Sequence, residues 1–214
     1  MKNTFYIDKY AIWTGTDDIK CPKVDFVPSL IRRRLTEVEK IGLYLSEQLE
    51  PLSDINCIVF ASQFGEWQQT IKLIEQMHEE NEMSPAGFSH SVHNAMPGLW
   101  AIVHQSSCNY TTVAANEMTI DCAFLEALSR GGKVLLVYAE EECPEFYKSS
   151  FPKPNTGHGA GVVLSLKPEG EARKVLFETL SHSTKNHLTF KELTDFLENK
   201  KELQSPFFVL KDEQ

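Results

Sequence analysis

The stretch Tyr110–Glu140, YTTVAANEMTIDCAFLEALSRGGKVLLVYAE, decides the fold of this chain. Its first part, Thr111–Ala115, is a run of β-branched and small residues that predicts a short strand. Asn116 stands where the N-cap of a following helix would stand. Gly131–Gly132 ends that helix, and the apolar run Lys133–Ala139 predicts a buried strand. A turn between a strand and a helix commonly presents a reactive or ligand-facing group, so the chemistry of Asn116 bears directly on function.

The composition is that of a globular protein, with 42% hydrophobic and 24% charged residues in 214. The formal net charge of −9 argues against nucleic-acid binding, which needs a basic surface. No apolar run approaches the roughly 18 residues of a membrane span. The first ten residues, MKNTFYIDKY, lack the apolar stretch of a signal peptide, so we expect a cytoplasmic protein.

Strand and helix patterns alternate along the chain, which predicts an α/β fold with a mostly parallel sheet flanked by helices. We expect the part after Leu166 to form a mainly helical tail, including a helix that starts at Thr189 with Glu192 completing a capping box. The expected strands are residues 5–13, 55–62, 111–115, 133–139 and 162–166, with 207–210 as a candidate edge strand and 171–180 as either a short helix or a strand. The main expected helices are residues 29–49, 66–81, 95–103, 117–130 and 189–203.

Three consecutive arginines, Arg32, Arg33 and Arg34, lie in the first turn of the helix expected from Ser29 to near Pro51. Cations at a helix N-terminus oppose the helix dipole, so their presence needs a reason. They form either a solvated face with acidic neighbours or a docking point for an acidic partner.

Neither the histidines nor the glycines predict a cofactor site. His90 and His93 form an HxxH pair, and His104 follows, but no third ligand stands at a diagnostic metal spacing. We therefore expect hydrogen-bonded structural histidines and no metal. The glycine-rich run 157–161 precedes a strand, so a close backbone approach explains it better than phosphate binding.

The cysteines do not supply an obvious nucleophile. There are five, an odd number without a CxxC pair, which argues against a disulfide framework or a metal knuckle. A thiol at the central turn would be activated by the helix N-terminus, but Asn116 is neither a nucleophile nor a base. Cys108 lies eight residues upstream, and Cys122 lies inside the predicted helix.

Several segments resemble the N-terminal half of the β-ketoacyl synthases, and in particular the short synthase-like branch called chain-length factors. The resemblance spans about Phe5 to Leu166, and the segment beginning Ser91-Val92-His93-Asn94-Ala95 is its most specific part. The segments that carry it are Ser91–Ala95 with Pro97-Gly98 and Trp100–Ile102, Thr111–Leu128, Gly157–Leu166 with His158 in place of a glutamate, and Arg32–Leu35.

The resemblance implies a thiolase-like half fold with a five-stranded sheet, with residues 1–167 as the synthase-like domain and residues 168–214 as a helical extension packed on it. In an active synthase, a cysteine that is acylated occupies the position of Asn116. The catalytic histidines come from a second half, for which this chain has no room. We therefore expect no cofactor and no catalysis by the chain alone.

The resemblance further implies a heterodimer or heterotetramer with a full-length β-ketoacyl synthase, as a subunit of a 3-oxoacyl-carrier-protein synthase complex. The partner would pair with the edge strand Thr111, Thr112, Val113, Ala114 and Ala115, because unpaired strand edges invite pairing. Met118, Ile120 and Phe124 could wall the partner's acyl tunnel or could be plain core residues. The branch is typical of aryl-polyene and related polyketide or fatty-acyl pathways.

Two alternatives remain open at this stage. The chain could be an independent cysteine acyltransferase or thioesterase that uses Cys108 with His93 or His104 as the base. It could also be a scaffold that binds an acyl carrier protein through Arg32, Arg33 and Arg34.

Overall fold

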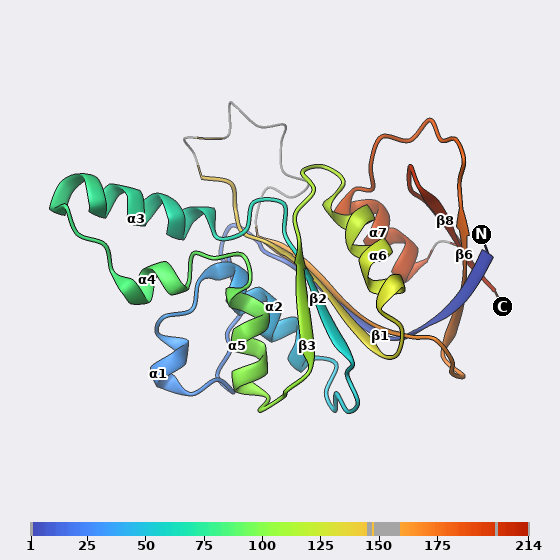
Figure 1. The fold of residues 1–214 in the computed structure, drawn as a ribbon, viewed down its shortest axis with the longest axis horizontal. Coiled ribbons are helices and arrows are strands. Elements are labelled where there is room, and N and C mark those ends of the chain that lie inside the picture. Colours follow the sequence, from blue (N-terminus) through green and yellow to red (C-terminus); the bar gives the residue numbers. More distant parts are fainter. Residues whose placement is uncertain (1, 145–146, 148–158, 200, 214) are drawn as a thin grey trace.

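The computed structural model describes residues 2–144, 147, 159–199 and 201–213, and places them around one eight-stranded sheet with helices on both faces (Figure 1). The strand order is β3-β2-β4-β5-β1-β6-β8-β7. The strands are β1 (Lys2–Thr14), β2 (Cys57–Ala61), β3 (Asn109–Val113), β4 (Val134–Glu140), β5 (Ala160–Lys167), β6 (Arg173–Thr179), β7 (Glu202–Gln204) and β8 (Phe208–Asp212).

The stretch from Tyr110 to Glu140 forms the predicted strand, turn, helix and strand. β3 and β4 both run parallel to β2, which lies between them. Helix α6 (Thr119–Arg130) connects β3 to β4, as parallel strands require a crossover. Every residue of β4 is buried, because helices cover both faces of the sheet at its centre.

The α/β class is confirmed, but the sheet is larger and less parallel than expected. It has eight strands where five were predicted, and the five pairings from β4–β5 through β7–β8 are antiparallel. β1 is long enough to pair with β5 over one part and with β6 over the other. The short connection after β7 leads directly to its antiparallel neighbour β8, whereas helices connect the parallel strands.

The expected helical tail is also wrong, because residues 168–214 contain three strands and the helix α7 (Phe190–Glu198). The predicted capping box of Thr189 and Glu192 is present at the start of α7. The tail is tied to α6 by the buried Asp121, which accepts hydrogen bonds from the Ser205 hydroxyl at 2.6 Å and from the backbone N–H of Leu188 at 3.0 Å. The division of the chain at Lys167 stays a prediction.

The two faces of the sheet carry separate hydrophobic cores. Alternate residues of β2 face opposite ways: Cys57, Val59 and Ala61 pack with α6 and α7, and Ile58 and Phe60 pack with α2 (Glu37–Glu47) and α5 (Ala95–Val103). Figure 1 shows these two helix pairs on opposite sides of the strands. Helix α3 (Trp67–Glu80) buries only Leu73 of its residues, and α4 (Pro85–Ser89) follows it.

The helix expected from Ser29 is broken into α1 (Ser29–Arg32) and α2. The break occurs because Thr36 forms a capping box with Glu39: Thr36 Oγ1 accepts from the Glu39 N–H, and the Glu39 carboxylate accepts from the Thr36 N–H. The arginine run therefore ends α1 and fills the turn, and it does not oppose the dipole of a long helix.

The glycines at the start of β5 allow close approach of other chain segments, as predicted. A Cβ added to Gly161 would lie 2.7 Å from the Tyr138 carbonyl oxygen, and one on Gly159 would lie 3.2 Å from that of Lys20. Gly157 and His158 lie outside the described residues.

Candidate functional site

The turn that follows β3 has an unusual backbone at Asn116, where φ is +52°. Asparagine is one of the few residues other than glycine that adopts this left-handed conformation readily. Thr119 secures the turn, since its hydroxyl donates to the Asn116 carbonyl at 2.6 Å and accepts from the Ala115 N–H at 3.0 Å. Helix α6 starts at Thr119 with Met118 as N-cap, so the prediction of Asn116 as the N-cap is wrong. Helix α6 therefore starts after the left-handed turn, later in the chain than predicted.

The side chain of Asn116 is exposed and contacts a second carboxamide. Gln63 Nε2 donates to Asn116 Oδ1 at 3.0 Å. Gln63 follows β2, the strand beside β3, so the two residues meet at the carboxyl ends of parallel strands. The pair can donate and accept hydrogen bonds but offers neither a nucleophile nor a titratable proton.

Two carboxylates at the end of β4 hold the Gln63 loop in place. Glu140 accepts hydrogen bonds from the Ser62 hydroxyl at 2.9 Å and from the backbone N–H of Gln63. Glu141 accepts from the backbone N–H of Gln68 in the first turn of α3, at 2.7 Å. A carboxylate at a helix N-terminus is favourable because it satisfies a free N–H group near the positive end of the dipole.

These carboxyl groups are buried, and burial changes their titration. Burial raises the pKa of Glu140 to about 7 and that of Glu141 to about 8, against the opposing effect of the N–H groups they accept from. Burial, with a further contribution from the charge of Glu39, raises the pKa of Glu66 to about 9. Sequence reasoning missed this cluster and Gln63; the run of acidic residues after a buried strand was the available signal.

The histidines of the HxxH pair have separate structural partners, as predicted. His90 Nδ1 lies 2.7 Å from the buried Glu39 carboxylate. His93 Nε2 lies 2.9 Å from the Ser62 carbonyl oxygen, and its ring packs on Phe60. His93 therefore supports the loop between β2 and α3.

Cys108 and His104 lie at the opposite end of β3 from Asn116. Both line a cavity of about 440 Å³, together with Glu50 and Trp100. His104 stacks on Trp100, and its Nδ1 lies 3.0 Å from a Glu50 carboxylate oxygen. Burial lowers the pKa of His104, and the charges of Glu50 and Glu47 oppose this effect. His93 does not line this cavity, so of the two histidines considered as a base only His104 shares a cavity with Cys108.

The three predicted tunnel residues do not share one environment. Ile120 and Phe124 are buried in the core between α6 and the sheet, where Phe124 packs on Phe208. Met118 is 40% exposed beside Asn116. The plain-core interpretation fits Ile120 and Phe124, and Met118 alone is available on the surface.

The arginine run is only partly accessible. Arg32 Nη1 pairs with Asp25 at 2.7 Å, whereas Arg33 and Arg34 are exposed in the turn between α1 and α2. Within the described residues, neither Arg33 nor Arg34 forms an ion pair.

β3 lies at one edge of the described sheet, as the resemblance predicted, and pairs only with β2. Its residues are exposed or half-buried, and Tyr110 is 42% exposed. The strand ends at Val113, so Ala114 and Ala115 belong to the turn.

Comparison with known proteins identifies the family. Residues 9–206 match the N-terminal domain of the β-ketoacyl synthases. The chain belongs to this family. The match includes most of the tail, in agreement with a sheet that continues through β6, β8 and β7.

Solved structures of similar fold include ketosynthase complexes. One chain of the complex between the ketosynthase ApeO and its chain length factor ApeC, from Xenorhabdus doucetiae, matches with a TM-score of 0.77 and 19% identity, and the match covers 98% of this chain and 99% of that one. One chain of AntDE:AntF, a type II polyketide synthase acyl-carrier protein in complex with its ketosynthase, matches with a TM-score of 0.58 and 15% identity, and the match covers 78% of this chain and 64% of that one. One chain of the ishigamide ketosynthase/chain length factor matches with a TM-score of 0.56 and 15% identity, and the match covers 70% of this chain and 50% of that one.

At these identities the solved structures establish a shared fold only. A search of curated proteins found no match. Among the described residues, no helix is long and apolar enough to cross a membrane.

Proposed function

We propose that this synthase-family chain is a non-catalytic chain-length-factor subunit that pairs with an active β-ketoacyl-carrier-protein synthase and shapes its acyl tunnel. The observation that carries the proposal is Asn116, which occupies a left-handed strand-to-helix turn and engages Gln63 through its carboxamide. The turn is of the kind that presents a nucleophile, but the group it presents cannot accept an acyl chain as a thioester.

The neighbouring cysteine does not replace the missing thiol. Cys122 lies within α6, and burial raises the pKa of its thiol, with a smaller contribution from Asp121. A raised pKa leaves less thiolate at neutral pH, and thiolate is the reactive form. This supports a role in which the chain assists the chemistry of another protein.

The exposed edge of β3 supports pairing with that protein. An unpaired strand edge offers backbone N–H and C=O groups to a second chain, and it promotes aggregation if left open. Two of the similar solved structures are ketosynthases with chain length factors. Beside β3, Met118 is the one tunnel candidate of the three that is exposed enough to reach a partner.

An acyl carrier protein is the second proposed partner. Arg33 and Arg34 are exposed next to each other, and Arg32 is already paired with Asp25. A docking contact of this kind would weaken with added salt, because exposed charges are screened. The pathway would be of the aryl-polyene, polyketide or fatty-acyl type.

Co-expression with a full-length, cysteine-bearing β-ketoacyl synthase tests the pairing. We expect the two chains to copurify in fixed stoichiometry and the longest acyl products to require both. A matched run uses the synthase with its nucleophile replaced by alanine, which should bind the chain equally but make no product. A chain that stays monomeric and leaves product length unchanged would contradict the proposal.

One observation favours a second candidate, a cysteine acyltransferase or thioesterase. Cys108, His104 and Glu50 line one cavity, and His104 is paired with Glu50. Thioester hydrolysis by the chain alone, abolished in Cys108→Ala and retained in Cys122→Ala, would establish this activity. The chain-length-factor proposal predicts no hydrolysis by either variant or by the native chain.

A further inference from the structure

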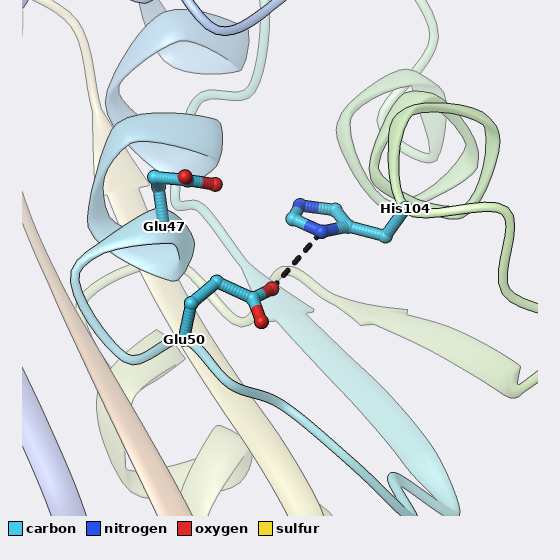
Figure 2. A group of neighbouring side chains, drawn as sticks. All are labelled: Glu47, Glu50 and His104. Atoms are coloured by element: carbon cyan, nitrogen blue, oxygen red, sulfur yellow. Dashed lines mark ion pairs between the residues drawn. The ribbon is translucent and has the colours of Figure 1, made fainter.

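Two helix ends bring together three potential metal ligands at the rim of the cavity beside Cys108. Glu47 is the last residue of α2, Glu50 lies three residues beyond it, and His104 follows α5 directly. One ligand atom from each lies within 4.8 Å of the other two. Figure 2 shows both carboxylates pointing toward the imidazole ring.

Among the described residues, no lysine or arginine forms an ion pair with either carboxylate of this cluster. Both carboxylates lie at the C-terminal end of α2, where the helix dipole disfavours negative charge, and the last turn of α2 carries no basic residue. The ammonium of Lys9 lies close, but it donates to the backbone carbonyls of Leu49 and Glu50.

The side chains of the cluster retain unused ligand capacity. The Glu47 carboxylate has no hydrogen bond or ion pair in the part of the chain that the structure describes. His104 Nε2 is buried there without a hydrogen-bond partner. The Glu50 carboxylate accepts from the Leu52 N–H at 2.8 Å, which fixes its orientation beside His104.

We propose that Glu47, Glu50 and His104 bind a divalent transition-metal ion, of which Zn²⁺ matches the ligands best. Imidazole and carboxylate are common zinc ligands, and Zn²⁺ takes four ligands at about 2.0 to 2.2 Å from nitrogen and oxygen. Three atoms within the observed spacing therefore need to converge only slightly on one ion. The cavity next to His104 leaves room for a fourth ligand.

Such an ion would join the ends of α2 and α5, which pack together on one face of the sheet. An ion that binds only the folded chain stabilises it, and the stabilisation grows with the concentration of free ion relative to the dissociation constant. Zinc should therefore raise the unfolding temperature of the native chain.

Titration with Zn²⁺ tests the site, using calorimetry for stoichiometry and tryptophan fluorescence for location. Trp100 stacks on His104 with ring centroids 4.4 Å apart, so binding at His104 should change its emission. We expect one ion per chain, with affinity at least about tenfold lower in Glu47→Gln and in Glu50→Gln. Glu75→Gln, at an exposed glutamate of α3, is the matched control and should bind like the native chain.

Both variants remove only a charge, and thermal unfolding in the absence of metal will show that they fold. The proposal would be overturned if zinc produced no heat and no fluorescence change. It would also be overturned if Glu47→Gln and Glu50→Gln bound zinc as tightly as Glu75→Gln, because the ion would then lie elsewhere. Equal affinity for Mg²⁺ would exclude ligation by the imidazole, since Mg²⁺ prefers oxygen ligands.

Discussion

At the scale of single residues, Asn116 supplies no nucleophile, and its position places two structural demands on the residue. The position needs a residue that tolerates a φ of +52°, and the Gln63 contact needs a hydrogen-bond acceptor. Asparagine meets both demands without offering a nucleophile. The sequence alone pointed to Asn116, but it could not reveal Gln63, because their contact joins two loops that are 53 residues apart.

Substitution of Asn116 separates the two demands. Asn116→Ala should destabilise the chain by about 1 kcal/mol, because alanine resists the left-handed conformation. Asn116→Gly loses the same hydrogen bond but accepts the conformation, so it should be clearly more stable than the alanine variant. Urea unfolding midpoints measure the difference, and equal midpoints would show that the turn is not strained.

The buried carboxyl groups predict a stability that falls as pH rises. The pKa of Glu66 is about 9 in the folded chain, against an ordinary value of 4.5. Between these values the folded state holds more protons than the unfolded state, so the free energy of unfolding decreases with increasing pH. Glu140 and Glu141 act in the same direction, with pKa values of about 7 and 8.

Glu66→Gln should remove the contribution of Glu66 to this decline. At pH 9 the variant should be more stable than the native chain by several kcal/mol, and at pH 5 the two should nearly coincide. Unfolding free energies at several pH values provide the test. A native chain whose stability is flat or rises between pH 6 and 9 would show that these groups titrate normally.

At the scale of elements, the sequence predicted those helix features that depend on interactions within a single segment. The α5 bounds and the capping box of α7 agree with the sequence, because the apolar pattern and the cap lie within one segment. The break between α1 and α2 had a local signal as well, the capping-box residues Thr36 and Glu39, which was missed. In the tail, β8 matches the apolar run 207–210 that was expected as an edge strand, and β6 lies in the segment left open as helix or strand. β7 was missed because it has only three residues and is paired only with β8.

Gly161 tests how tightly α2 packs on the sheet. An added methyl group would lie within 2.8 Å of Ile41, Leu45 and the Tyr138 carbonyl oxygen. Gly161→Ala should therefore destabilise the chain by about 1 to 3 kcal/mol through overpacking. Gly170→Ala is the control, since its nearest neighbours would lie at 3.9 Å. Similar thermal midpoints for the two variants would contradict this packing.

At the scale of the whole molecule, the described sheet has two different edges. β3 forms one edge next to the Asn116 turn, and β7 forms the other within the tail. The resemblance predicted the first edge. The sequence did not predict the second, because the continuation of the sheet depends on the long strand β1 pairing with β6.

The two edges supply a matched test of the proposed partner surface. Tyr110→Lys places a charge on the exposed face of β3 and should weaken binding to the synthase at least about tenfold, because charges on edge strands oppose pairing. Gln204→Lys places the same charge on β7 and should leave binding unchanged. Binding of each variant to immobilised synthase measures both affinities. Equal losses of affinity in the two variants would show that the synthase does not bind at the β3 edge.

The central claim is that this chain forms no acyl-enzyme and that its partner does. The most direct measurement is intact-protein mass spectrometry after incubation with an acyl thioester, first for the purified chain alone and then with the synthase. The proposal predicts an acyl adduct on the synthase cysteine and none on this chain in either incubation. An adduct on this chain in the absence of the synthase would contradict the account.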